Sequence, residues 1–153
     1  MPLHPDWGVG SRRCYAWFMT DSLTIAVLPE VLSVCRLGPD APVPDWALNA
    51  RPFSSVTRTA DELSLICPTS CVPVDADDEQ AIARNDGWRA LKLLGPIAFT
   101  EVGVLLKIAA PMRDAGISIL PVATFDTDYV LVPGRELQRA CDALRNAGHR
   151  ISG

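Results

Sequence analysis

The spacing of apolar residues divides the chain into a strand-rich first half and a second half in which helices and strands alternate. Between residues 104 and 112, apolar side chains recur at helical spacing and form one face of a helix. Residues 135–147 carry a second such face. Short β-rich runs predict strands at residues 88–94, 117–123 and 129–132, with a short final strand near Ile151. The second half therefore reads β-α-β-β-α, followed by a last strand.

The first half is richer in β-branched residues and in proline. Two apolar runs, residues 23–28 and 31–36, flank Pro29 and predict two strands joined by a tight turn, where the missing N–H of proline does least harm. Prolines interrupt residues 37–52, so a loop is expected there, with Trp46 and Leu48 packed on the core. Residues 53–58 and 63–67 follow as two further predicted strands.

This order of elements predicts an α+β fold. It fits two ferredoxin-like βαββαβ units in tandem, of which the first is degenerate because its helices are eroded. Four acidic residues between positions 75 and 79 read as a calcium loop or as a solvated linker, and the missing EF-hand spacing favours the linker. We expect an N-terminal extension at 1–21, a first unit at 22–74, an acidic linker at 75–86 and a second unit at 87–153.

Composition narrows the classes of partner. The chain has 153 residues, is 48% hydrophobic and carries a net charge of −4 without a basic run, so nucleic acid is not an expected partner. No apolar run approaches the ~20 residues that span a bilayer, so no membrane is expected either. Residues 1–21 weakly imitate a signal peptide, but their apolar part is short, and we expect a cytoplasmic protein.

The five cysteines and two histidines do not form a pattern typical of a metal or catalytic site. Only Cys67 and Cys71 are close in sequence, and both histidines lie at the chain ends. We expect the cysteines to act as small apolar residues in a reducing compartment, with no metal and no cofactor. The chain also lacks a Ser-His-Asp set and a phosphate-binding glycine loop, so an enzyme is not expected. A thiol nucleophile at Cys67 or Cys71 remains an alternative, and it would need a base from elsewhere in the fold.

The stretch around the first predicted helix of the second half carries the most specific chemistry. Thr100 is a candidate N-cap, and Glu101 suits the positive end of the helix dipole. The free N–H groups of a helix start suit a carboxylate. Asp126 and Asp128 lie in the turn between the two following strands, where they suit a cation. Together these groups fit a zwitterionic or cationic amino acid, although turn residues and core packing account for the same side chains.

Four segments in order also carry a resemblance to a known family: residues 95–104, 108–112, 115–119 and 124–132. They resemble the ACT domain and, more narrowly, the tandem ACT proteins related to the CASTOR cytosolic arginine sensors. Residues 32–36 and 53–66 resemble the first ACT unit of that family. The resemblance implies a regulatory protein that binds an amino acid where two units meet. The alternative is an interaction module that is built on ACT units and binds no ligand.

The resemblance also implies a set of ligand-binding positions. They are Ala98, Phe99, Thr100, Glu101, Val102, Gly103, Val104, Thr124, Phe125 and Asp128. In the arginine sensors the opposite wall comes from another unit, which a homodimer of this chain would supply around Lys107 and Ile108. Thr100 stands where those sensors carry an acidic residue, which weakens the expectation of a cationic ligand.

Overall fold

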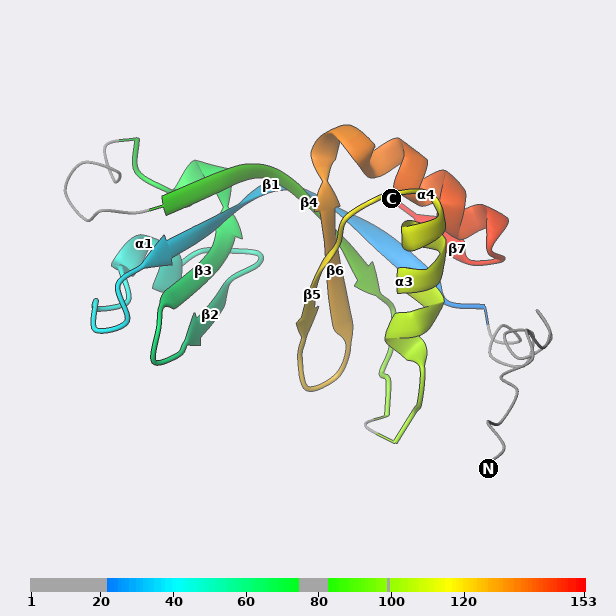
Figure 1. The fold of residues 1–153 in the computed structure, drawn as a ribbon, viewed down its shortest axis with the longest axis horizontal. Coiled ribbons are helices and arrows are strands. Elements are labelled where there is room, and N and C mark those ends of the chain that lie inside the picture. Colours follow the sequence, from blue (N-terminus) through cyan, green and yellow to red (C-terminus); the bar gives the residue numbers. More distant parts are fainter. Residues whose placement is uncertain (1–21, 75–82, 99) are drawn as a thin grey trace, which may run out of the picture.

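A seven-stranded sheet is the central element of the fold. The computed structural model describes residues 22–74, 83–98 and 100–153 (Figure 1). The strand order is β2-β3-β1-β4-β6-β5, and β7 pairs with β1 off this path. The predicted N-terminal extension, residues 75–82 of the predicted linker and Phe99 lie outside the described residues.

Two long antiparallel strands, β1 (Thr24–Leu37) and β4 (Ala83–Leu93), run through both halves of the molecule (Figure 1). Residues 24–26 of β1 pair in parallel with β7 (Arg150–Ser152) at the C-terminal end of the chain. Residues 32–37 of the same strand pair with β3 (Leu63–Pro68), which in turn pairs with β2 (Ser55–Arg58). Each long strand is therefore shared by the two units.

The prediction of two strands separated by a turn at Pro29 is wrong, because β1 is continuous. The register between β1 and β4 shifts between Val27 and Val31. Pro29 lies in this irregular stretch, so its missing N–H breaks no bond of the regular ladder. Strand β1 therefore includes Pro29 and extends from one unit into the other.

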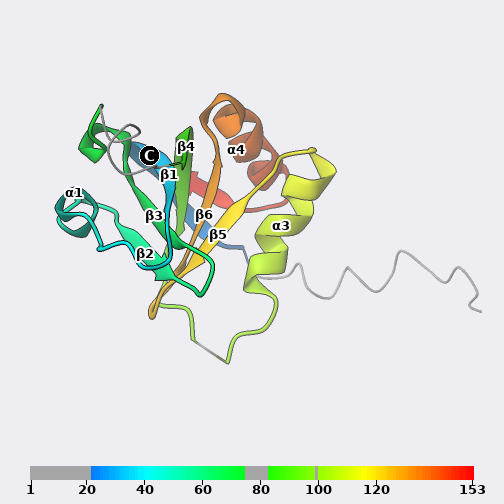
Figure 2. The ribbon, with the colours of Figure 1, turned by 60° about the vertical axis from the view of Figure 1, so that its left-hand side comes forward.

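The second unit has the predicted βαββαβ order. After β4 come α3 (Val104–Asp114), β5 (Leu120–Ala123), β6 (Asp128–Pro133), the short helix η3 (Gly134–Glu136), α4 (Leu137–Asn146) and β7. Helices α3 and α4 lie on the same side of the sheet (Figure 2). Fully buried Leu91, Ile108, Val130 and Leu144 form the centre of the core between sheet and helices, and each contributes roughly 1.5–3 kcal/mol.

The first unit keeps the strands but has lost most of its helical layer. Its helices are α1 (Asp45–Leu48) and the short η2 (Thr69–Cys71). Trp46 packs against the core of this unit as predicted, whereas Leu48 is 57% exposed, so the prediction for Leu48 is wrong. A helix of one turn offers one narrow face to the sheet, and the neighbouring residues point to solvent. The degenerate first unit is confirmed.

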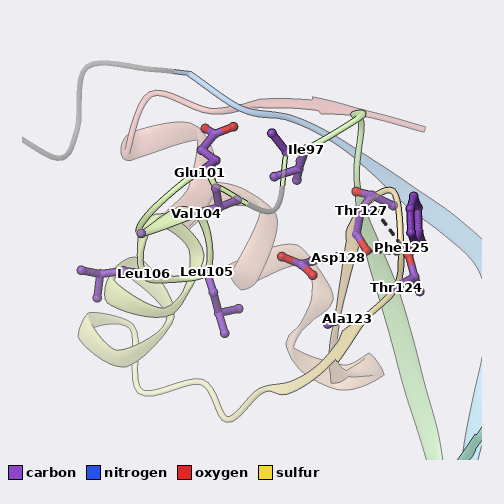
Figure 3. A pocket seen from close by; sticks show the side chains of 12 residues that line it. Ile97, Glu101, Val104, Leu105, Leu106, Ala123, Thr124, Phe125, Thr127 and Asp128 are labelled. Atoms are coloured by element: carbon purple, nitrogen blue, oxygen red, sulfur yellow. Dashed lines mark hydrogen bonds between the residues drawn. The ribbon is translucent and has the colours of Figure 1, made fainter.

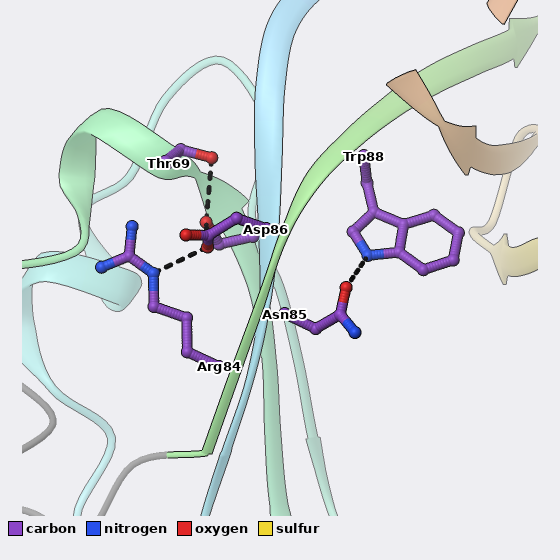
Figure 4. A network of polar contacts seen from close by, with 6 residues as sticks. Thr69, Arg84, Asn85, Asp86 and Trp88 are labelled. Atoms are coloured by element: carbon purple, nitrogen blue, oxygen red, sulfur yellow. Dashed lines mark hydrogen bonds and ion pairs between the residues drawn. The ribbon is translucent and has the colours of Figure 1, made fainter. Parts of the chain in front are cut away.

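A polar network joins β1, η2 and the beginning of β4 (Figure 4). The buried Ser33 hydroxyl lies 2.5 Å from the Asp86 carboxylate and 2.9 Å from the Thr69 hydroxyl, and Arg84 Nε donates to Asp86 at 2.7 Å. Partial burial alone would raise the pKa of Asp86, but the hydrogen bonds from Arg84 and Ser33 outweigh it and hold that pKa below its usual value. Residues 83–86 of the predicted linker therefore belong to a strand, while the division of the chain into four parts stays a prediction.

The two units contact each other through an apolar cluster on the sheet face away from α3 and α4. Phe53 from the first unit packs edge-on against Tyr129 of β6, with ring centroids 5.0 Å apart. Leu32, Ala90 and Leu131 are fully buried beside them. Among the helices of the described chain, none is long and apolar enough to cross a membrane.

Candidate functional site

A hollow of about 300 Å³ lies between the start of α3 and the hairpin that joins β5 to β6 (Figure 3). All of its lining residues belong to the second unit. They are Ile97, Ala98, Glu101, Gly103, Val104, Leu105, Leu106, Ala123, Thr124, Phe125, Thr127 and Asp128. The segment before the helix and the hairpin are far apart in sequence, and the fold brings them to opposite walls of one space.

Most of the predicted site residues line this hollow. Those that do are Ala98, Glu101, Gly103, Val104, Thr124, Phe125 and Asp128. Thr100 and Val102 are exposed and do not line it, and Phe99 is outside the described residues. The sequence reasoning missed Ile97, Leu105, Leu106, Ala123 and Thr127. Leu105 and Leu106 lie in the first turn of the observed helix, so a correctly placed helix start would have been the available signal. Ligand contact at all these positions stays a prediction.

The helix begins later than predicted, which exposes its first turn to the hollow. Gly103, not Thr100, is the N-cap, with φ of 80° and no side-chain capping bond. Glycine adopts this left-handed conformation without strain, and the chain enters the helix there. The Lys107 N–H donates to the Gly103 carbonyl at 3.2 Å and closes the first turn of the helix. The amides of residues 104–106 therefore precede the internal ladder and are available to an acceptor in the hollow.

The opposite wall is a turn held by hydrogen bonds. The Thr124 hydroxyl donates to the Thr127 carbonyl at 2.6 Å, and the Thr127 hydroxyl donates to the Leu93 carbonyl at the end of β4. The Ile97 amide donates to the Asp126 carbonyl at 2.8 Å. These bonds hold the turn against the loop before α3, so the half-buried Asp128 side chain has a defined position between them (Figure 3).

The electrostatic character of the hollow follows from these two walls. Glu101 and Asp128 supply carboxylates, and none of the lining residues described above is basic. The start of α3 supplies the positive end of a helix dipole and unpaired N–H groups. A molecule with an anionic group at the helix and a cationic group at Asp128 matches both walls.

The predicted contribution of Ile108 to a partner's site is wrong. Ile108 is fully buried in the core of its own unit, because it lies on the face of α3 that packs on the sheet. Lys107 is half-buried and lies on a different side of the helix. The Ile108 side chain is therefore not available to a partner, while a contribution of Lys107 stays a prediction.

Cys67, one of the two candidate thiol nucleophiles, does not suit that role. Burial, reinforced by Cys35 and Cys71 nearby, raises the pKa of Cys67 to about 12, so its nucleophilic thiolate form is strongly disfavoured. Cys71 is half-buried and Cys141 is buried, while Cys14 lies outside the described residues. Within the described ranges, no group of three or more His, Cys, Asp or Glu side chains is placed to hold a metal ion.

Comparison with known proteins gives the family. A family model described as an ACT domain matches residues 83–146, and a second model, described as an N-terminal domain, matches residues 30–75. Protein Atu0741 from Agrobacterium tumefaciens, known from a crystal structure, is 35% identical in sequence to this chain. The two structures superimpose with a TM-score of 0.77 over 86% of this chain and 93% of that one. The chain belongs to the ACT domain family.

More distant relatives share parts of this similarity. The human protein named cytosolic arginine sensor for mTORC1 subunit 1 is 26% identical over 140 residues, which are 86% of this chain and 41% of the sensor. The chain thus spans less than half the length of the curated relatives that it matches. The regulatory subunit of aspartate kinase from Thermus thermophilus shares the fold, with a TM-score of 0.58 and 15% identity over 80% of this chain and 96% of that one. Two ACT-type units in tandem are therefore the architecture of this chain.

Proposed function

We propose that this chain is a regulatory protein that binds an amino acid in the hollow beside α3 and has no catalytic activity of its own. The observation that carries the proposal is that one wall of the hollow suits an anionic group and the opposite wall suits a cationic group. One wall offers the uncapped start of α3, and the other offers the Asp128 carboxylate. The name of the human relative, an arginine sensor, supports a small amino acid-like ligand and a cytoplasmic location.

In the proposed complex, the ligand carboxylate accepts hydrogen bonds from the amides of residues 104–106. Its ammonium group lies against Asp128, and the ligand side chain extends toward Leu105 and Phe125 at the edge of the hollow. Charge-assisted bonds of this kind are shorter and stronger than neutral ones. Because Thr127 fixes the turn that precedes Asp128, the carboxylate is positioned before the ligand arrives.

A second copy of the chain is the proposed cover of the open side. Val102 is 80% exposed and Phe125 is 78% exposed, and both lie at or beside the hollow with the half-exposed Leu106. Large apolar side chains grouped in this way are typical of a surface that another protein covers. Regulation would then follow from the different affinity of the ligand for two packings of the paired chains.

Isothermal titration calorimetry with each of the twenty amino acids, at millimolar concentration, tests the proposal. We expect at least one to bind, and Asp128→Asn to weaken that binding by about tenfold or more. Asp126→Asn is the matched control, because Asp126 lies in the same turn but does not line the hollow. If no amino acid binds the unmodified chain, the proposal is wrong.

The second candidate function is an interaction module without a ligand. The same exposed apolar residues beside α3 favour it. Sedimentation velocity separates the two: a dimer whose dissociation constant does not respond to any amino acid supports the interaction module. A dimer that tightens or weakens with one amino acid supports the sensor.

A further inference from the structure

Helix α3 contains a proline where a backbone hydrogen bond is missing. Pro111 lies inside the helix, and the helix continues past it to Asp114. Because proline has no N–H, the carbonyl of Lys107, four residues earlier, loses its usual partner. The sequence predicts a kink or a weak last turn at this point. The structure supplies a substitute donor from the C-terminal end of the chain.

That donor is His149, which is 8% exposed. Its Nε2 lies 3.2 Å from the Lys107 carbonyl oxygen. On the other side of the ring, the Leu23 amide donates to Nδ1 at 3.2 Å. A backbone amide is always a donor, so Nδ1 is the acceptor and the proton of the neutral ring is on Nε2. Both ring nitrogens are thus satisfied, and Nε2–H donates to Lys107.

The position of the ring is itself set by backbone bonds. The His149 amide donates to the Leu144 carbonyl at 3.0 Å, just after Gly148 ends α4 with φ of 91°. The next amide, that of Arg150, donates to the Leu23 carbonyl at 2.9 Å. Leu23 therefore contacts the segment after α4 through both its N–H and its C=O, at the point where β1 begins beside β7.

We propose that His149 is a positioning residue for α3. It replaces the N–H that Pro111 lacks and joins the helix to the beginning of β1. Helix α3 carries the first turn that lines the hollow, and β1 continues into the first unit. The histidine therefore connects the wall of the hollow to a strand that both units share. This inference goes beyond the amino acid-binding proposal and does not need a ligand to be true.

A double-mutant cycle tests the dependence of His149 on Pro111. In the unmodified chain we expect His149→Ala to lower the equilibrium constant for folding, measured by urea denaturation, by about tenfold. Pro111→Ala restores an N–H within reach of the Lys107 carbonyl, so in that background the loss should shrink to about threefold or less. Equal losses in both backgrounds would overturn the proposal.

Nuclear magnetic resonance supplies a readout that does not depend on a variant at position 149. The chain has two histidines, so His4→Gln leaves His149 as the single imidazole. Long-range nitrogen–proton spectra should show the neutral ring with its proton on Nε2. A proton on Nδ1 would contradict the geometry whatever the result of the cycle. Amide exchange at Lys107, whose N–H is bonded to the Gly103 carbonyl, should be faster in His149→Ala and slower again in the double variant.

Discussion

The two units contain the same hairpin with different side chains. In the first unit the β2–β3 turn joins Arg58 to Leu63, and in the second the β5–β6 turn joins Ala123 to Asp128. Each turn begins with a threonine whose amide donates to a carbonyl three residues on, at 2.9 Å in both. The two turns thus share this backbone hydrogen bond, and their side chains differ.

At this place the first unit buries an apolar side chain, whereas the second carries a carboxylate that lines a hollow. Leu63, the counterpart of Asp128, is fully buried. Arg58, the counterpart of Ala123, extends to the loop before α1 and donates to the carbonyls of Pro39 and Ala41. The helix after this loop, α1, has four residues, whereas its counterpart in the second unit, α3, has eleven. An ACT-type backbone therefore does not by itself make a pocket, because the same place serves core packing in one unit and a hollow in the other.

The loops before the helices show the same contrast. Both begin with Leu-Gly-Pro, at residues 37–39 and 94–96. A Cβ atom on Gly38 would meet nothing within 4 Å. A Cβ atom on Gly95 would lie 2.7 Å from the Ile97 nitrogen and 3.2 Å from the Asp126 carbonyl oxygen. A side chain at position 95 would therefore crowd the backbone of its own loop and, less closely, that of the hairpin, whereas position 38 has room for one.

Exchanging the two counterpart residues should give the largest effect. Leu63→Asp places a carboxylate in a closed core without a partner, and we expect a loss of about 4 kcal/mol or more in the free energy of unfolding. Asp128→Leu, at the half-buried position, should change stability by about 1 kcal/mol or less and abolish amino acid binding. Urea denaturation and calorimetry measure the two effects. A Leu63→Asp chain as stable as the unmodified one would show that position 63 is not buried in the core.

Substituting the two glycines should give the next largest effect. Gly95→Ala should destabilise the chain by about 2 kcal/mol, because the new methyl group meets backbone atoms that cannot move aside cheaply. Gly38→Ala is the matched control and should be neutral or stabilise by roughly 0.5 kcal/mol through the unfolded chain. Thermal unfolding of both variants decides the point, and equal midpoints would contradict the difference in packing.

The cores of the two units should respond differently to alkali. Cys67 of β3 is the counterpart of Val132 in β6. Burial raises the pKa of Cys67 from its ordinary value of 9.0 to about 12. Above pH 9 the unfolded chain loses this proton while the folded chain keeps it, so stability falls as pH rises toward 12, with a limiting slope of about 1.4 kcal/mol per pH unit. Cys67→Val should reduce that slope in urea titrations between pH 8 and about 10, and an unchanged slope would contradict the assignment.

The smallest effect is expected at Arg58. Its side chain is exposed, so Arg58→Ala should cost about 1 kcal/mol or less despite the loss of bonds to Pro39 and Ala41. Amino acid binding should keep the affinity of the unmodified chain, since the ligand site is in the other unit. A new, second binding event in the calorimetric trace would show that Arg58 alone occludes a functional site in the first unit.

The sequence alone determined the features that depend on neighbours a few residues apart. The apolar faces of α3 and α4 follow the helical period, and Gly116, with φ of 69°, ends α3 as predicted. Local spacing also predicted the hairpin that ends at Asp128 and the short helices of the first unit. The resemblance to the ACT domain depended on the order of such segments. Each depends on local spacing, turn residues and proline, which act within one element.

The tertiary structure decided what depends on distant partners. Pro29 lies within one strand because β4 pairs with β1 on both sides of it. Helix α3 is capped by Gly103 and not by the predicted Thr100. Leu105 and Leu106 therefore lie in its first turn and line the hollow. Pro111 is tolerated because His149, 38 residues later in the chain, donates a hydrogen bond to the Lys107 carbonyl. Pairing, burial and hydrogen bonding between remote segments are set by the whole fold, so no local pattern predicts them.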